Sequence, residues 1–256
     1  MPSRGPIITW LTVEAGQYLS GLNFQGDGDF LSPHEREKFA GLRFSRRISG
    51  WLLGRRAAKT LLKSTCPDLA YIPETAITIA NNPAGAPCIQ VDGRDHYPGC
   101  LSITHRRNLA LAAYCPSPGW KIGIDLEIVE DRHESFLLDY FTPAEVAAAH
   151  ACAGESRSLW ITLAWSVKES ALKALGTGLR LDTRSIEVGS APGLNQQPGT
   201  QPPGWQKISL SSDLFPAGSG CAWWQQRGDF VLTVAVISPD GKAITQNDIC
   251  LLELSK

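Results

Sequence analysis

The stretch "WKIGIDLEIVEDR", Trp120 to Arg132, combines a strand pattern with two acidic residues. Apolar side chains recur at every second position, which is typical of a strand with one buried face; they are Ile122, Ile124, Leu126 and Ile128. Asp125 and Glu127 are two residues apart, so both carboxylates project from the other face. Neighbouring carboxylates repel each other, and a bound divalent cation would remove that conflict. A solvated acidic face is the simpler alternative.

Length and composition limit the classes of protein to consider. A chain of 256 residues is long enough for one large domain or two small ones. The net charge of −1 gives no overall basic field, so we expect neither nucleic acid nor a membrane surface as a partner. No apolar run approaches the ~20 residues of a membrane helix, and residues 1–16 predict a first strand rather than a signal peptide.

The cysteines are scattered, odd in number and without a CxxC pair. They are Cys66, Cys88, Cys100, Cys115, Cys152, Cys221 and Cys250. This pattern favours reduced, mostly buried thiols in a cytoplasmic protein over a disulfide framework or a zinc site.

The order of helical and strand signals occurs twice along the chain. In the first part, helical patterns over 32–63 follow a strand at 9–14 and precede strands at 76–80, 87–91, 101–104 and 109–114, with "THRRN" (104–108) as a hairpin connection. In the second, a strand at 121–128 precedes helices at 142–151 and 157–175 and strands at 185–189, 207–211, 219–226 and 229–237. Residues 190–205, rich in Pro, Gly and Gln, predict a mobile surface loop.

We therefore predict an α+β fold made of a pseudo-twofold pair of similar α/β halves. Each half is a small, mainly antiparallel sheet packed on a long helix, with 1–118 as the first half and 119–256 as the second. Laying 9–14 over 122–127 matches Thr12 with Asp125 and Glu14 with Glu127. Only the second half then carries both acids, so we expect one active site per chain, at the joint between the halves.

A second group of polar residues lies in "WSVKESALK", Trp165 to Lys173. On a helix, Trp165, Glu169 and Lys173 share one face, whereas Lys168 is turned by about 100° from Glu169. An ordinary surface Glu–Lys pair is the simpler explanation. If Glu169 instead reaches the same cation as the two strand acids, three carboxylates form a site of the kind that suits Mg²⁺.

Basic residues gather at two further places. "LSITHRRN" puts His105 at a strand end before two arginines, where phosphate could bind, although a lone histidine is more often structural. The helical region 43–59 carries Arg43, Arg46, Arg47, Arg55, Arg56 and Lys59. Such a run is usually a solvated face, but it also matches the needs of a phosphate-rich ligand.

"GIDLE" (123–127), followed by "WSVKESALK" (165–173), resembles the 4′-phosphopantetheinyl transferases of the surfactin-synthetase-activating (Sfp) type. The supporting motifs occur in the same order over nearly the whole chain: "NPAGAP" (82–87), "LSITHR" (101–106), "YFTPAE" (140–145) and "GTGL" (176–179).

The resemblance implies a monomeric cytoplasmic enzyme of the holo-[acyl-carrier-protein] synthase kind, with the family's pseudo-twofold fold. It would transfer the 4′-phosphopantetheine arm of coenzyme A to a serine of an acyl or peptidyl carrier protein, with Mg²⁺ as cofactor. Adenosine 3′,5′-bisphosphate would leave. The carrier could belong to fatty acid, polyketide or nonribosomal peptide biosynthesis.

The resemblance also assigns roles in the second half. Asp125, Glu127 and Glu169 correspond to the Mg²⁺ ligands, and Glu169 also to the general base for the carrier serine, directly or through water. Lys173 corresponds to the lysine at the leaving phosphate, and Lys168 to a second lysine that faces a phosphate.

In the first half, the resemblance puts His105 near the ribose 3′-phosphate with Thr104 beside it. It puts the loop residues Gly85 and Pro87 against the adenine, and it assigns 1–118 to the nucleotide-binding side and 119–256 to the metal and catalytic side.

Some positions depart from the family pattern. Ala86 replaces a motif lysine, Arg106 replaces the serine after the histidine, and Trp51 stands where many members have a polar residue. We predict that Arg47, Arg55 and Arg106 compensate at the 3′-phosphate.

The sequence is compatible with alternatives at two points. The apolar segment 136–150 is either a carrier-protein docking site or simply a core-facing helix. The same acids would also serve a Mg²⁺-dependent pyrophosphate hydrolase acting on coenzyme A, or would persist in a non-catalytic coenzyme A-binding protein.

Overall fold

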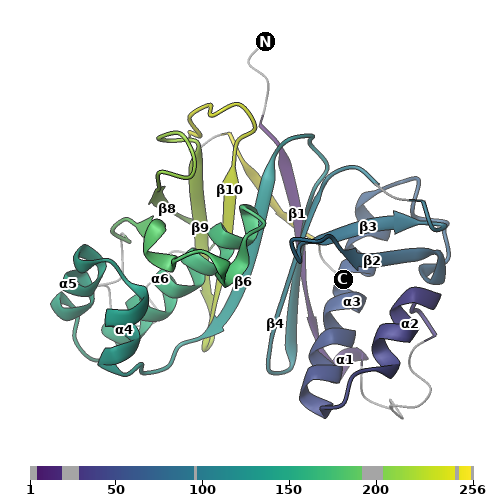
Figure 1. Cartoon of the computed structure of the whole chain (residues 1–256), viewed down its shortest axis with the longest axis horizontal. Helices are drawn as coiled ribbons and strands as arrows, with labels where there is room; N and C mark the ends of the chain where they lie inside the picture. The colour runs from purple at the N-terminus through teal and green to yellow at the C-terminus, as the bar shows by residue number, and fades with distance from the viewer. Residues whose placement is uncertain (1–4, 19–28, 95–96, 192–203, 246–247, 255–256) are drawn as a thin grey trace. The chain divides into compact units, whose positions relative to one another are not determined.

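A computed structural model describes residues 5–18, 29–94, 97–191, 204–245 and 248–254. The chain forms two compact units, labelled by element in Figure 1. Unit 1 contains Met1–Pro118 and Cys250–Lys256, and unit 2 contains Gly119–Ile249. The prediction that the second half runs to residue 256 is wrong for the last seven residues, because strand β11 (Cys250–Glu253) pairs in parallel with β1 (Ile7–Glu14) of unit 1.

Unit 1 is a four-stranded sheet in the order β11-β1-β5-β4, with a separate two-stranded sheet β2-β3. The strands are β4 (Cys100–Arg106), β5 (Leu109–Cys115), β2 (Ile77–Asn81) and β3 (Pro87–Val91), and the helices are α1 (Ala15–Tyr18), α2 (Pro33–Ala40), α3 (Ser45–Thr65) and the 3₁₀ turn η1 (Glu74–Ala76). Leu11 and Val13 of β1 pack with Leu53, Ala57 and Leu61 of α3 in one apolar core. Helix α3 therefore covers one face of the sheet.

The hairpin between β4 and β5 is shorter than predicted. Its two strands pair as far as Arg106 with Leu109, which leaves Arg107 and Asn108 as the turn. Arg107 has a left-handed φ of 52°, as tight two-residue hairpins require. His105 and Arg106 are thus strand residues with fixed directions rather than loop residues.

Unit 2 is an antiparallel sheet in the order β6-β10-β9-β8-β7. The strands are β6 (Lys121–Ile128), β7 (Glu187–Val188), β8 (Gln206–Ser211), β9 (Gly220–Arg227) and β10 (Phe230–Ile237). The helices are α4 (Glu134–Tyr140), α5 (Pro143–Ala151), α6 (Gly154–Ala174), and the 3₁₀ turns η2 (Gly178–Arg180) and η3 (Thr183–Ser185). Figure 1 shows the long helix α6 lying across the sheet of this unit.

The predicted α+β class is confirmed, since each unit has a sheet packed on a 21-residue helix. The strand predicted at 185–189 shortens to two residues, because the turn η3 occupies its start. Most of the predicted loop at 190–205 lies outside the described residues. None of the described helices is long and apolar enough to cross a membrane.

The predicted alignment of the repeat is wrong by one residue. Asp125 of β6 bonds to side chains of α6, whereas Leu11 and Val13, not Thr12, pack against α3. A shift of one residue moves a side chain to the opposite face of a sheet. Counted from the start of each eight-residue strand, Leu11 and Val13 hold the places of Asp125 and Glu127.

Candidate functional site

Strand β6 approaches α6 closely at Gly123. A side chain there would meet the backbone oxygen of Ser170 at 1.9 Å, so only glycine allows this contact. Because side chains alternate along a strand, Asp125 and Glu127 point to the same side as Gly123, toward α6. The glycine of "GIDLE" thus brings two carboxylates to the helix.

Asp125 is 4% exposed, and α6 provides partners for both of its carboxylate oxygens. The Lys173 ammonium lies 2.7 Å from Oδ1, and the Ser166 hydroxyl donates to Oδ2 over 2.9 Å. Lys173 also donates to the carbonyl of Ile124. This side of α6 therefore carries both a positive charge and a neutral donor for one buried acid.

Glu169 lies in the electrostatic field of the same group. Burial raises its pKa most, Lys173 lowers it, and the charges of Asp125 and Glu127 raise it further. Glu127 in turn lies 3.7 Å from the Arg132 guanidinium. The three predicted acids thus act on one another across the β6–α6 interface of unit 2.

The acids do not form a complete metal site as the side chains stand. Over the described part of the chain, no three His, Cys, Asp or Glu side chains are grouped closely enough to hold a metal ion. The Lys173 ammonium forms an ion pair with Asp125. The donors nevertheless fit a hard divalent cation in type and charge, because they are three carboxylates and the charges of Asp125 and Glu127 raise the pKa of Glu169.

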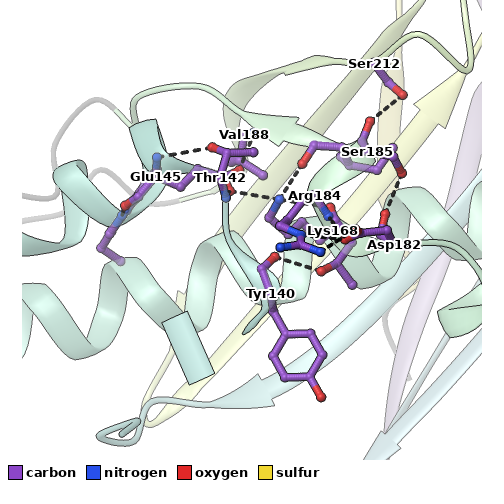
Figure 2. Close-up of polar contacts among 12 residues, drawn as sticks. Tyr140, Thr142, Glu145, Lys168, Asp182, Arg184, Ser185, Val188 and Ser212 are labelled. Atoms are coloured by element: carbon purple, nitrogen blue, oxygen red, sulfur yellow. Dashed lines mark hydrogen bonds and ion pairs between the residues drawn. The ribbon is translucent and has the colours of Figure 1, made fainter. Parts of the chain in front are cut away.

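The structure places Lys168 away from these acids. Its side chain is fully buried, and its ammonium lies 2.9 Å from the Glu145 carboxylate and donates to the carbonyls of Thr183 and Ile186. Figure 2 shows Lys168 and Glu145 within this polar network of unit 2. The predicted contact between Lys168 and a phosphate does not fit this position, because the partners of its ammonium are a buried carboxylate and two backbone carbonyls of the same unit.

Glu145 holds three elements together. One carboxylate oxygen accepts from the Thr142 backbone at the start of α5, and the other accepts from the Val188 backbone of β7 (Figure 2). Burial lowers the pKa of Lys168, and the Glu145 charge raises it. We assign Lys168 and Glu145 to the stability of unit 2, in place of a role at the substrate.

Arg55 is also buried within its unit. Its guanidinium lies 4.7 Å from the centre of the Trp51 ring and its Nε lies 3.6 Å from Glu35. Glu35 is at the same time the partner of buried Lys59. Arg55 therefore has its partners inside the unit, which argues against the prediction that it compensates at the 3′-phosphate.

Thr104 and His105 point to opposite faces of β4, because they are neighbours in a strand. Thr104 is buried and His105 is exposed. The His105 ring packs onto Gly50 of α3, where a side chain would meet the ring atoms at 2.5 Å. The two residues cannot contact one ligand from the same face of the strand.

The other residues predicted at the nucleotide end are more accessible. Gly85 lies in the exposed β2–β3 turn with a left-handed φ of 89°, and Pro87 begins β3. Arg47 is exposed in the first turn of α3, and Arg106 is half-buried at the end of β4. All of these residues belong to unit 1, and their contacts with the nucleotide stay predictions.

The segment 136–150 is partly core and partly surface. Leu137 and Ala149 are fully buried, whereas Leu138 is 62% exposed. Next to Leu138, the rings of Tyr140 and Phe136 pack on Trp165 of α6 at 5.2 and 5.0 Å between centroids. The core-facing alternative holds for Leu137 and Ala149, and carrier docking stays a prediction for the exposed part of the segment.

Sequence reasoning missed the buried hydroxyls beside Asp125. Ser166 lies inside the "WSVKES" motif but has no charge to draw attention. Thr233 lies in an apolar strand and pairs directly with Asp125 across the sheet. Its role depends on the register of β10 against β6, which no local pattern reveals.

Comparisons with known proteins find a family match in the part of the chain that contains these residues. The family model of the 4′-phosphopantetheinyl transferase superfamily matches residues 121–235, which contain β6 and α6. 4′-Phosphopantetheinyl transferase Sfp of Bacillus subtilis (strain 168) is 26% identical over 159 residues, which are 62% of this chain and 66% of the relative.

The L-aminoadipate-semialdehyde dehydrogenase-phosphopantetheinyl transferase of Xenopus laevis is 23% identical over 172 residues, 63% of this chain and 55% of the relative. The human protein of the same name is 23% identical over 193 residues, 72% of this chain and 58% of the relative. The chain thus spans between about half and two thirds of the length of these relatives.

Among solved structures, the holo-[acyl-carrier-protein] synthase of Thermotoga maritima is similar with 21% identity and a TM-score of 0.36. That match covers 46% of this chain and 62% of the synthase chain. The sequence matches confirm the resemblance to the 4′-phosphopantetheinyl transferase superfamily. Within it, the similarity to Sfp supports the Sfp-like type that the motifs indicate.

Proposed function

We propose that this chain transfers the 4′-phosphopantetheine arm of coenzyme A to a serine hydroxyl of an acyl or peptidyl carrier protein. The observation that carries the proposal is the group of Asp125, Glu169 and Lys173 between β6 and α6, inside the region that matches the family model. Adenosine 3′,5′-bisphosphate is the leaving group.

The proposed reaction forms one bond to a phosphorus atom and breaks another bond at the same atom. The serine oxygen bonds to the phosphorus that carries the pantetheine arm, and the bond from that phosphorus to the bridging oxygen breaks. The serine proton passes to Glu169, directly or through a water. Burial, which raises the pKa of Glu169, makes it a better proton acceptor near neutral pH. Lys173 supplies positive charge for the leaving phosphate.

Asp125, Glu127 and Glu169 are the residues that would hold a divalent cation, and Mg²⁺ is the ion proposed. When bound, such an ion adds positive charge at the pyrophosphate oxygens. The support is the donor chemistry: three carboxylates compete for the positive charges of Lys173 and Arg132.

At the nucleotide end, we propose His105 at the ribose 3′-phosphate and the Gly85–Pro87 turn at the adenine. Arg47 and Arg106 remain the arginines proposed to replace the missing motif lysine, because Arg55 is engaged with Glu35 and Trp51. The cytoplasmic location and the monomeric state stay predictions.

The exposed apolar side chain of Leu138 and the neighbouring Tyr140 form the proposed docking patch for the carrier protein. Leu138→Asp should raise KM for the carrier about tenfold while leaving binding of coenzyme A unchanged, because burying an apolar side chain contributes about 1.5–3 kcal/mol. Leu214→Asp is the matched control, since Leu214 is an exposed leucine of the same unit. Equal effects of both variants would exclude this patch.

The decisive experiment supplies the protein with coenzyme A, Mg²⁺ and a panel of apo carrier proteins from fatty acid, polyketide and nonribosomal peptide synthesis. Mass spectrometry should show one carrier gaining the mass of one phosphopantetheine arm, and excess EDTA should stop the gain. Release of adenosine bisphosphate without any gain of mass would instead indicate a hydrolase.

Glu169→Gln tests the proton acceptor. It should retain binding of coenzyme A and lose transfer, because the amide keeps the shape of the side chain but accepts no proton. Near wild-type turnover would contradict the assignment of Glu169 as the base. Binding of coenzyme A by the wild type without transfer or hydrolysis would indicate a non-catalytic binding protein.

A further inference from the structure

A chain of buried hydroxyl groups lies directly behind Asp125. Ser166 Oγ donates to Asp125 Oδ2 over 2.9 Å, and Thr233 Oγ1 lies 2.9 Å from Ser166 Oγ. Thr233 Oγ1 also lies 3.0 Å from the Ser166 carbonyl oxygen and 3.2 Å from Ser170 Oγ, so its single proton has three neighbouring acceptors. Ser166, Ser170 and Thr233 are all fully buried. The group comes from α6 and β10, and Ser166 is its member that bonds to Asp125.

The direction of these hydrogen bonds follows from the chemistry of the carboxylate. An ionised Asp125 only accepts, so the single proton of Ser166 is directed to Asp125. Ser166 Oγ then has its lone pairs left, and Thr233 can donate its single proton to them in place of the Ser166 carbonyl. A hydroxyl that accepts one bond while donating another donates more strongly. Thr233 therefore supports the bond that fixes Oδ2.

Unit 1 shows that the fold does not need these hydroxyls. Counted from the first residue of the two 21-residue helices, Ala57 of α3 holds the place of Ser166. Ala112 pairs with Leu11 of β1, as Thr233 pairs with Asp125 of β6. Both alanines are fully buried in the apolar core of unit 1. The same packing between helix and sheet thus forms with alanine at both places.

We infer that Ser166 and Thr233 are positioning residues that fix the Asp125 carboxylate for a divalent cation. The inference rests on the proposed function. With Oδ2 held by Ser166, rotation of the carboxylate is prevented and Oδ1 faces Lys173 and the side where Glu169 lies. Partners behind a metal ligand typically change metal affinity or activity by roughly ten- to a hundredfold.

Binding of Mn²⁺ to the full chain, measured by the electron paramagnetic resonance signal of free Mn²⁺ in the presence of coenzyme A, tests this inference. Ser166→Ala should raise the Kd for Mn²⁺ roughly tenfold or more, and Thr233→Ala should raise it less, because its hydroxyl acts through Ser166. Thr233→Ser keeps the hydroxyl and should restore wild-type affinity. The urea midpoint of Ser166→Ala should fall somewhat, because Asp125 Oδ2 loses its buried donor, and urea unfolding shows whether the variant is still folded.

Transfer assays separate positioning from catalysis. In Ser166→Ala, raising the Mg²⁺ concentration should restore kcat, because the residues that contact the substrate are intact. Wild-type Mn²⁺ affinity in both alanine variants would overturn the inference, as would a loss of kcat that saturating Mg²⁺ does not restore. If Ser166→Ala does not fold, the comparison of Thr233→Ala with Thr233→Ser decides. Absence of Mn²⁺ binding in the wild type would refute the proposed cation itself, whatever the variants do.

Discussion

Unit 1 and unit 2 contain the same buried ion pair. Lys59 of α3 and Lys168 of α6 hold the same place, counted from the first residue of each helix. Lys59 lies 2.6 Å from Glu35 and donates to the carbonyls of Phe30 and Glu74, just as Lys168 binds Glu145 and two carbonyls.

The acidic partners match atom by atom. Each glutamate is the third residue of a helix with a capping box, and each accepts from the backbone of its N-cap residue, Ser32 or Thr142. The second oxygen of each accepts from a strand backbone, at Ile79 in one unit and at Val188 in the other. Unit 1 has this ion pair although it lacks the acids that correspond to Asp125 and Glu127. We therefore assign the ion pair to the fold and not to the proposed reaction.

The contact between the long helix and the sheet differs between the units. Where unit 2 has Asp125, Ser166 and Thr233, unit 1 has Leu11, Ala57 and Ala112. The polar set replaces an apolar one on the same framework, although buried polar groups cost more than apolar packing unless they are fully bonded. This difference separates residues that build the fold from residues that serve the proposed reaction.

The largest expected effect comes from breaking the ion pairs. Lys168→Met and Lys59→Met should each lower the free energy of unfolding by about 3–5 kcal/mol, because each leaves a buried glutamate without its partner. Urea unfolding of both variants measures this. Lys168→Met with wild-type stability but weakened binding of coenzyme A would restore the predicted role at a phosphate and break the equivalence.

The next effect comes from giving unit 2 the residues of unit 1. A variant with Asp125→Leu, Ser166→Ala, Thr233→Ala and Lys173→Ser should fold with a free energy of unfolding equal to the wild type or up to about 4 kcal/mol higher. Replacing a buried ion pair by apolar packing is often neutral or stabilising by about 1–4 kcal/mol. Transfer activity should disappear. Clear destabilisation in urea would mean that the polar set is part of the fold.

A smaller effect concerns the helix of unit 1. Gly50→Ala would displace the His105 ring and should raise KM for coenzyme A about tenfold, since a hydrogen bond to a charged group contributes about 1.5–3 kcal/mol. Gly54→Ala is the control, because its side chain would meet Ile103 instead. Unchanged KM in Gly50→Ala would remove His105 from the proposed phosphate site.

The smallest effect is a pH dependence of stability that unit 2 alone should show, because Thr60 holds the place of Glu169 in α3. Burial raises the pKa of Glu169 above its usual 4.5, so the ionised side chain destabilises the folded, metal-free protein. In EDTA, Glu169→Gln should raise Tm at pH 8. The gain should shrink as pH falls through the raised pKa of Glu169 toward 4.5. A gain independent of pH would show that the charge of Glu169 is not the cause.

Much of the architecture could be predicted from the sequence. The strand at 121–128 agrees with β6 at both ends, and the apolar periodicity located both long helices within a few residues. The pattern Ser32-Pro-x-Glu35 occurs again as Thr142-Pro-x-Glu145, and each is followed by a lysine at the same place in the next long helix. This repeat indicates a shared ion pair, which the charges of the lysines considered singly do not reveal.

Other parts could not be predicted because they depend on long-range pairing. The parallel strand β11 pairs with β1, from which about 240 residues separate it, and no local pattern specifies such a partner. The register error between Thr12 and Leu11 arose because alternation identifies two faces but not which face meets the helix.

For the candidate site, the sequence by itself determined that Asp125 and Glu127 share a face and that Glu169 and Lys173 share another, because strand and helix periods are local properties. Only the tertiary structure decided which charged side chains pair with other buried groups of the protein. It paired Lys168 with Glu145 and Arg55 with Glu35, and it placed Ser166 and Thr233 behind Asp125. A lysine has the same local pattern whether it faces a ligand or a buried glutamate, so burial and partners had to come from the packed fold.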